Sequence, residues 1–214
     1  MEAMSNHLLI WGAGGHGKVI LDIARSMGRF DDIAFLDDNR TKAGQSFCEC
    51  LLVDASENLQ RCAGSLFVIA IGDNHIRARC FSRALASGLL PATLVHRSAL
   101  LGTSTSIGKG TVVMPGVIVN AGAVIGDNCI INSGAIVEHD CRIEANVHIS
   151  PRVVLGGGVC VGQFAHIGIG ATVLPGALVG EESIVGAGAV VLREVTAHCT
   201  VVGVPAKARL HAAS

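Results

Sequence analysis

One short segment of the chain, Val137-Glu138-His139-Asp140-Cys141, brings three titratable side chains together. Imidazole is the side chain whose pKa suits general-base chemistry near neutral pH, and a neighbouring carboxylate raises its basicity. His139 is therefore the predicted general base, and Asp140 is the acid predicted to tune it. Because neighbouring residues of a strand point to opposite faces, this pairing requires the chain to turn at Asp140.

Two more histidines follow this segment at a regular spacing. His148 lies nine residues after His139, and His166 follows His148 at twice that spacing. If one coil of the fold spans the longer spacing, the two rings stack, and a pair of neutral imidazoles exchanging hydrogen bonds is the structural interpretation. A metal site is a weaker interpretation of these histidines, because a close spacing such as H-x-x-x-H and a thiolate cluster are both missing. We therefore expect no bound metal.

A glycine-rich segment near the beginning of the chain is typical of a nucleotide-binding loop. The stretch Gly12-Ala13-Gly14-Gly15-His16-Gly17 fits G-x-G-x-x-G, and Asp37 lies twenty residues after its last glycine. Backbone N–H groups at a helix N-terminus stabilise an anion, and a carboxylate at a strand end accepts hydrogen bonds from a ribose or base. Asp38 and Asp73 are expected at the same edge. The pattern indicates a nucleotide-type ligand, with a purely structural turn as the alternative.

The elements expected to position this loop alternate between strands and helices. Apolar strands are predicted over 7–11, 33–36 and 66–71, and helices over 18–27 and 76–86. Such a series predicts a small parallel sheet with the loop at its carboxyl edge. With about three or four strands and no second mononucleotide half, the sheet does not favour a nicotinamide-dependent enzyme.

The rest of the chain carries a repeat of six residues. Seventeen consecutive hexads, from Val95 to Thr196, each begin with an aliphatic residue, and their fifth position holds only small or β-branched residues. This period predicts a β-helix, in which each short strand stacks on the coil below. Three hexads would make one triangular coil, with the first side chain inside the prism and glycines at the second and fourth positions forming the corners.

Composition narrows the class of protein further. The formal net charge of -1 gives no electrostatic reason to expect binding to nucleic acid or to an anionic membrane. We expect a cytoplasmic protein, because no apolar run is long enough to cross a bilayer and the N-terminus lacks the features of a signal peptide. The eight cysteines include no C-x-x-C pair and are expected to be reduced, mostly buried thiols.

Taken together, and in the order in which they occur along the chain, these motifs resemble those of the NeuD/PglD group of sugar acyltransferases. The resemblance covers essentially the whole chain, and it depends on Gly12–Gly17, Phe35–Asp38, Ile69–Asn74, Glu138–Cys141, His148–Ser150 and Gly203–Lys207. It implies a small Rossmann-like domain over 1–92 that binds a nucleotide sugar, followed over 93–214 by a left-handed parallel β-helix acetyltransferase domain with a short C-terminal tail. It also implies a homotrimer, with acetyl-CoA in the groove between neighbouring β-helices.

The resemblance also assigns roles to individual residues. His139 would be the general base and Asp140 its tuning acid, although some members have Glu at the second position. The nucleotide sugar would contact Gly12, Ala13, Gly14, Gly15, His16, Asp37, Asp38, Gly72, Asp73 and Asn74. Acetyl-CoA would contact His148, Gly157, Ile169, Gly170, Gly186, Ala187, Gly188 and Lys207.

The sequence thus predicts an acetyl-CoA-dependent N-acetyltransferase that acts on a nucleotide-linked amino sugar, of the UDP-4-amino-4,6-dideoxy hexose type. The acetyl group would pass directly to the sugar amine while His139 takes a proton. Two alternatives stay open: an O-acetyltransferase acting on sialic acid or a related sugar, and a non-catalytic trimeric scaffold or ligand sensor. Whether the N-terminal domain serves its own active site or that of a neighbour is also open.

Overall fold

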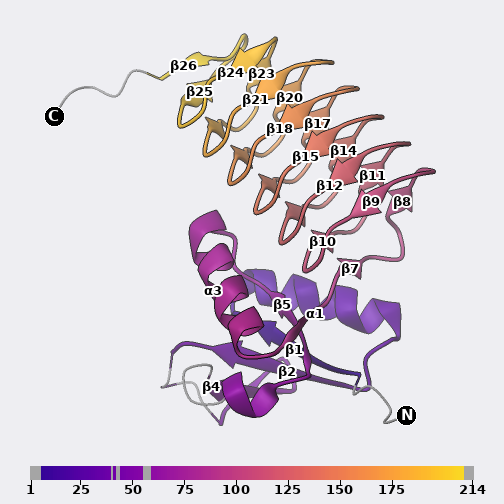
Figure 1. Cartoon of the computed structure of the whole chain (residues 1–214), viewed down its shortest axis with the longest axis vertical. Coiled ribbons are helices and arrows are strands. Elements are labelled where there is room, and N and C mark those ends of the chain that lie inside the picture. Colours follow the sequence, from indigo (N-terminus) through magenta and orange to yellow (C-terminus); the bar gives the residue numbers. More distant parts are fainter. Residues whose placement is uncertain (1–5, 40, 42–43, 55–58, 210–214) are drawn as a thin grey trace, which may run out of the picture.

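The chain folds into an α/β domain followed by a long solenoid, which Figure 1 shows one above the other. This computed structural model describes residues 6–39, 41, 44–54 and 59–209. Among these residues, no helix combines the length and apolar character needed to cross a membrane.

The α/β domain contains a six-stranded sheet of order β3-β4-β2-β1-β5-β6. Its strands are β1 (His7–Trp11), β2 (Asp32–Asp37), β3 (Ser46–Phe47), β4 (Cys50–Asp54), β5 (Leu66–Ile69) and β6 (Leu90–Pro91). All neighbouring strands are parallel except β3 and β4. The parallel sheet predicted from three strands is confirmed, but it is larger than predicted. The turn between β3 and β4 uses Cys48 and Glu49 at φ 50° and 66°, where no glycine marks it.

Two helices cover the two faces of this sheet. Helix α1 (Gly15–Met27) packs against Leu8 and Ile10 of β1, and helix α3 (Asn74–Ala86) packs against Leu9 and Trp11. The alternation along β1 follows from the two-residue period of a strand. Both helices begin two or three residues earlier than predicted. A short 3-10 helix, η2 (Leu59–Cys62), precedes β5.

The solenoid is a left-handed β-helix whose strands form three sheets, here called faces 1, 2 and 3 in chain order. Face 1 contains β7 (Leu94–Val95), β10 (Val112–Val113), β13 (Ile130–Ile131), β16 (His148–Ile149), β19 (His166–Ile167), β22 (Ile184–Val185), β25 (Thr200–Val202) and β26 (Lys207–Ala208). Face 2 contains β8 (Leu100–Leu101), β11 (Ile118–Val119), β14 (Ile136–Val137), β17 (Val154–Leu155), β20 (Thr172–Val173) and β23 (Val190–Val191). Face 3 contains β9 (Ser106–Ile107), β12 (Val124–Ile125), β15 (Arg142–Ile143), β18 (Cys160–Val161), β21 (Leu178–Val179) and β24 (Glu194–Val195).

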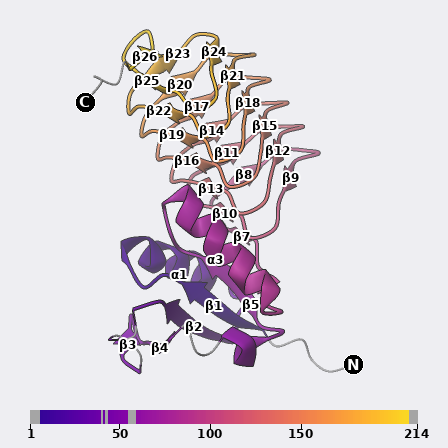
Figure 2. The same ribbon diagram turned by 60° about the vertical axis from the view of Figure 1, so that its left-hand side comes forward.

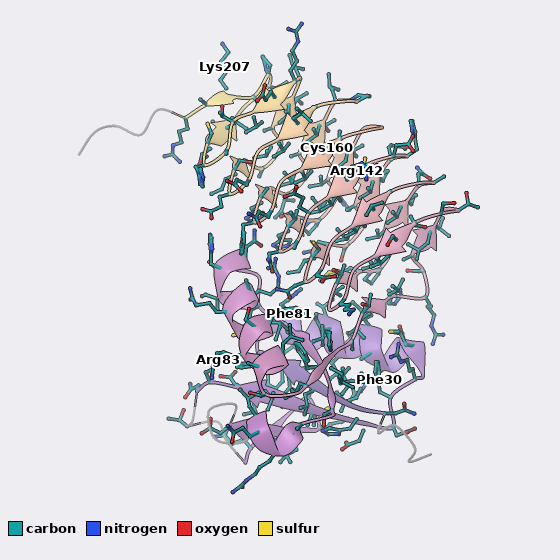
Figure 3. The ribbon with its side chains drawn as sticks, viewed as in Figure 1. Phe30, Phe81, Arg83, Arg142, Cys160 and Lys207 are labelled. Carbon is teal, nitrogen blue, oxygen red and sulfur yellow. The ribbon has the colours of Figure 1, made fainter. Side chains whose placement is uncertain are left out.

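The register of these sheets confirms a coil of three hexads. Ile131 pairs with Ile149, which pairs with Ile167, and these first-position side chains are fully buried inside the prism. Outward positions also stack: Arg142 and Cys160 are paired on face 3, and both are labelled in Figure 3.

The corners depart from the prediction that glycine shapes them. The fourth position of every hexad from Leu101 to Val185 has a positive φ, and many of these residues are not glycine, including Asn128 and Asp140. Glycine at the second position has a different purpose. A Cβ on Gly108 would lie 2.3 Å from the carbonyl carbon of Gly126, so close stacking of the coils excludes a side chain there.

The α/β domain covers the lower part of face 1, as Figure 2 shows. The outward side chains of Leu94, Val112 and Ile130 are therefore fully buried. On the next coils the outward positions hold His148, His166 and Ile184, which mark the point where this cover ends. The fold thus brings the carboxyl edge of the α/β sheet towards these histidines.

Candidate active site

The His139–Asp140 pair lies at the corner between faces 2 and 3, directly after β14. Asp140 has a φ of 59°, and this turn brings its Oδ2 to 2.9 Å from His139 Nδ1. The turn at Asp140 that this pairing requires is therefore present. The hydrogen bond to Asp140 raises the pKa of His139, and Asp140 and Glu138 add attractive charge in the same direction.

The geometry leaves one nitrogen of His139 for chemistry. In the neutral ring, an Nδ1–H that donates to Asp140 leaves a lone pair on Nε2. Nε2 faces the equivalent corner of the next coil, where a Cβ on Gly157 would lie only 2.5 Å away. The side chain of His139 is 63% exposed, so a substrate can reach the free nitrogen.

Replacing Asp140 with Asn is expected to move the acid limb of the pH profile for kcat/KM to lower pH. The carboxylate raises the pKa of His139, so its removal lets the ring lose its proton at lower pH, and the neutral ring is a weaker base. Asn also tolerates the left-handed conformation at this corner. A full pH–rate profile of the wild type and the variant measures the change, and an unmoved acid limb would exclude the tuning role of Asp140.

Replacing Gly157 with Ala is expected to lower kcat by about 10²-fold, because a displacement of the reacting group by about 1 Å has an effect of this size. The new methyl group would displace the His139 ring, which lies 2.5 Å from the position of the added Cβ. Steady-state kinetics measure the loss. In a His139→Ala background the same substitution should have almost no effect, whereas an undiminished effect there would show that Gly157 acts independently of His139.

The second group of histidines lies on face 1. The rings of His148 and His166 are stacked, with centroids 4.8 Å apart and an interplanar angle of 2°. They do not exchange hydrogen bonds as the structural interpretation proposed: His166 Nε2 lies 2.9 Å from Ser150 Oγ, and His148 Nε2 lies 3.2 Å from Asn132 Nδ2. Stacking places the ring nitrogens beside side chains of the neighbouring positions, not beside each other.

These histidines and His16 are held in the neutral form. Burial is the main cause and the Arg77 charge adds to it: together they lower the pKa of His16 to about 4, and with the charge of His166 they lower that of His148 to about 3. The pKa of His166 is lowered for the same two reasons. His16 also affects the pKa of His148, which places the glycine-rich loop close to face 1. Neutral imidazoles here offer hydrogen bonds without attracting anions.

A groove of about 430 Å³ runs between the pair His148 and His166 and the segment after β5. His148, His166, Phe164, Gly72, Asp73 and Asn74 are among the residues that line it. Asp73 Oδ1 accepts a hydrogen bond from Ile76 N at 2.8 Å and so caps α3. Asn74 Nδ2 donates to the Phe164 carbonyl at 2.8 Å, so its side chain already joins the two parts of the protein.

The glycine-rich loop forms one wall of a second hollow, of about 340 Å³. Its lining includes Gly12, Ala13, Gly14, Asp37, Asp38 and Trp11. Ala13 N donates to Asp37 Oδ2 at 3.2 Å, which fixes the loop against the end of β2. Within the described residues, no side chain caps α1 at Gly14, so the N–H groups of its first turn, which includes Gly15 and His16, are open to an anion.

The sequence did not identify Trp11 as part of this hollow, or Arg83 as a residue that holds its wall in place. Trp11 Nε1 donates to Asp38 Oδ2 at 3.2 Å, and the Arg83 guanidinium lies over the Trp11 ring at 4.9 Å and 3.3 Å from Asp38 Oδ1. Figure 3 labels Arg83 on α3. The presence of the single Trp at the end of the first strand, beside the glycine motif, was the available signal.

Five of the remaining residues assigned to acetyl-CoA lie at another corner of the β-helix. Ile169 and Gly170 follow β19, and Gly186, Ala187 and Gly188 follow β22, at the corner between faces 1 and 2. Ile169 is 60% exposed. Lys207 lies on β26 at the far end of the solenoid (Figure 3). One chain therefore places His139 and these residues on opposite sides of face 2.

Within the described part of the chain, no group of three or more His, Cys, Asp or Glu residues is placed to hold a metal ion. All eight cysteines are free thiols.

A left-handed β-helix joined to an α/β domain with a glycine-rich loop defines the class of hexapeptide-repeat transferases. Two family models agree with this: the PglD N-terminal domain matches residues 7–84, and the bacterial transferase hexapeptide (six repeats) matches residues 104–139.

Solved structures narrow the class to a family. A histidine-to-asparagine variant of perosamine N-acetyltransferase from Caulobacter crescentus, in complex with CoA and GDP-perosamine, is 37% identical, with a TM-score of 0.91 and coverage of 96% of this chain and 97% of that chain. The acetyltransferase domain of PglB from Neisseria gonorrhoeae, in complex with acetyl coenzyme A, is 36% identical, with a TM-score of 0.91 and coverage of 96% and 100%. WeeI from Acinetobacter baumannii is 26% identical, with a TM-score of 0.88 and coverage of 94% and 99%. The chain belongs to the hexapeptide-repeat family of sugar N-acetyltransferases.

Proposed function

We propose that this protein transfers the acetyl group of acetyl-CoA to the amino group of a nucleotide-linked amino sugar, with His139 as the general base. The observation that carries the proposal is the His139–Asp140 pair, whose Nε2 is free at an exposed corner of a fold shared along almost its whole length with sugar N-acetyltransferases. Residues 1–92 would bind the nucleotide sugar, and residues 93–214 would carry the transfer.

The proposed reaction is direct. The neutral sugar amine attacks the thioester carbonyl, and His139 Nε2 takes a proton from the attacking nitrogen. The C–N bond forms, the C–S bond breaks, and the CoA thiolate leaves and takes up a proton to give the free thiol. Asp140 stabilises the imidazolium that forms, as the carboxylate of a catalytic triad does. Binding of both substrates side by side supplies a large part of the rate enhancement.

The hollow beside the glycine-rich loop is the proposed nucleotide site. The open N–H groups at the start of α1 suit a diphosphate, and Asp37 and Asp38 suit the hydroxyls of a sugar or the edge of a base. Gly72 and Asp73 lie in the groove that extends from this edge to His148 and His166. This arrangement favours a nucleotide-linked substrate over a free sugar.

We further propose a homotrimer in which face 2 of each β-helix turns towards its neighbours. The outward side chains of this face are apolar on most of its coils: Leu100, Ile118, Ile136, Val154 and Val190. His139 lies at one edge of face 2, and Ile169 and Ala187 follow the other edge. In a ring of three chains, the first edge of one chain would meet the second edge of the next and enclose acetyl-CoA between them.

A substrate panel tests the proposed function and its O-acetyl alternative. UDP-, GDP- and dTDP-linked 4-amino sugars and free sialic acids are each incubated with acetyl-CoA, and release of free thiol is followed. We expect turnover with at least one nucleotide-linked amine and none with the free sugars. Turnover with sialic acids alone would replace this proposal with the O-acetyltransferase.

A further inference from the structure

Four residues stack at the corner between faces 3 and 1, one from each of four successive coils. They are Gly110, Asn128, Asn146 and Phe164, which lie three hexads apart and have φ values of 70°, 54°, 62° and 59°. We call them the corner ladder. Asn128 Nδ2 donates to Asn146 Oδ1 at 2.8 Å, which ties two of its members together.

Helix α3 contacts this ladder one turn at a time. Asn74 Nδ2 bonds the carbonyl of Phe164, Arg77 bonds the carbonyls of Asn146 and Asn128, and the Phe81 ring occupies the space that a Cβ on Gly110 would need, with Cε2 at 2.4 Å. A helical turn rises about 5.4 Å and stacked strands are about 4.8 Å apart. From Asn74 to Phe81 the helix rises about 10.5 Å and the four corner residues span about 14.4 Å, a difference that the long Arg77 side chain covers by reaching two coils. The N-terminal end of the helix lies highest on the solenoid.

Arg77 is the most connected residue of this contact, and it is only 1% exposed. Its guanidinium donates to Asn128 O at 2.9 Å and to Asn146 O at 2.8 Å on the solenoid. On the α/β domain it donates to Ile71 O at 3.3 Å and Gly72 O at 3.2 Å. Arg77 Nη2 also donates to Asn74 Oδ1 at 2.8 Å. One side chain thus bonds the segment after β5 and two coils at once.

The coil that Arg77 reaches through Asn146 is the one that carries His139. Residues 136–153 form this coil: β14 precedes His139, and β15 and Asn146 follow it before His148 begins β16. A displacement of α3 by one coil would therefore move Gly72 and Asp73 by about 4.8 Å along the solenoid relative to the base.

We infer that Arg77 is a positioning residue that sets the height of the nucleotide-sugar site along the solenoid relative to His139. This inference rests on the proposed function, because the height of the nucleotide-sugar site affects catalysis only if His139 acts on a sugar bound there. It holds whether the base belongs to the same chain or to a neighbour, since chains related by a threefold axis parallel to the solenoid keep equal heights.

Arg77 also acts on the charge state of the site. Burial lowers its own pKa to about 10, so it stays protonated at neutral pH, and its charge helps to lower the pKa of His16, His148 and His166. Asp73 and Cys129 are the other titratable groups that act on it. Loss of the Arg77 charge would let these histidines take up a proton at higher pH.

The test compares Arg77→Met, which removes the charge and the donors, with Arg77→Lys, which keeps the charge and fewer donors. For Arg77→Met we expect KM for the nucleotide sugar to rise at least about tenfold, since small misplacements have large effects. We expect KM for acetyl-CoA to stay within about twofold. Arg77→Lys should restore part of the lost affinity for the nucleotide sugar. An unchanged nucleotide-sugar KM in a folded Arg77→Met protein would overturn the inference, and so would equal rises in both KM values.

Two further measurements keep the test decisive. If Arg77→Met does not fold, Asn74→Ala removes one acceptor of Arg77 and two bonds to the solenoid, and a nucleotide-sugar KM unchanged by this variant would overturn the inference. If the wild type transfers no acetyl group to any nucleotide sugar, the proposed function fails. Amide hydrogen exchange of the unliganded proteins still tests the positioning: residues 71–75 should exchange faster in the Arg77→Met or Asn74→Ala variant than in the wild type, and equal rates would contradict it.

Discussion

Replacing His139 with Ala is expected to lower kcat/KM for acetyl transfer by about 10²- to 10⁴-fold, which is the usual contribution of a general base. Thermal unfolding should be almost unchanged, because this side chain is 63% exposed and the corner is held by backbone bonds such as that from Asp140 N to Ala121 O. Thiol release at saturating and subsaturating sugar measures the loss. A reduction of less than about tenfold would exclude His139 as the base.

His198 offers a matched control for this substitution. It is 62% exposed and lies 3.3 Å from Glu182 and 3.8 Å from Glu181, so it is also a surface histidine beside carboxylates. His198→Ala should change kcat/KM by less than about twofold. An equal loss in both variants would mean that surface histidines affect the assay in general, without a specific role for His139.

Replacing Ile136 with Glu is expected to dissociate the proposed homotrimer and to lower activity by more than about 10²-fold. Its outward side chain lies on face 2 beside the corner that carries His139, and a carboxylate buried at an interface without a partner is strongly unfavourable. Sedimentation velocity and thiol release measure the two effects. Leu178→Glu is the control, because Leu178 is an outward residue of face 3 and is 51% exposed. If Ile136→Glu leaves the molecular mass of the assembly unchanged, face 2 is not the interface.

Mixed trimers test whether neighbouring chains share the site. His139→Ala removes the base, and Gly14→Glu introduces a negative charge at the anion site, where open space surrounds Gly14. Co-expression of the two inactive chains should restore about a quarter of the wild-type activity if base and nucleotide loop come from different chains in a closed ring. No recovery would assign both to one chain.

The β-helix could be predicted almost completely from the sequence. The aliphatic first positions fix which side chains enter the prism, and the period of three hexads predicted that His166 stacks on His148. The corners could not be predicted from glycine alone, because stacked backbone bonds hold residues such as Asn128 and Asp140 in the left-handed conformation. In the α/β domain, the β3–β4 hairpin lacked any turn signal, since Cys48 and Glu49 form its turn.

The candidate site could be predicted only in part. The His139–Asp140 pair is local in sequence, and a single turn joins it. The contacts of Arg77 and Arg83 depend on how α3 lies against the solenoid and against Trp11, and an arginine on a basic helix looks in sequence like a solvated residue. The position of His139 relative to Ile169 depends on the path of the chain around face 2. The hexad repeat alone does not show which of the three faces each hexad belongs to.

The most direct test of the central claim follows both products of one reaction. Wild-type protein is mixed with acetyl-CoA and the nucleotide-linked 4-amino sugar that turns over fastest, and free thiol and acetylated sugar are quantified together. We predict equal amounts of both, an acetyl group on nitrogen by NMR, and no product from the analogue with a hydroxyl in place of the amine. Thiol release that is independent of the sugar, or acetyl groups on oxygen, would contradict the account.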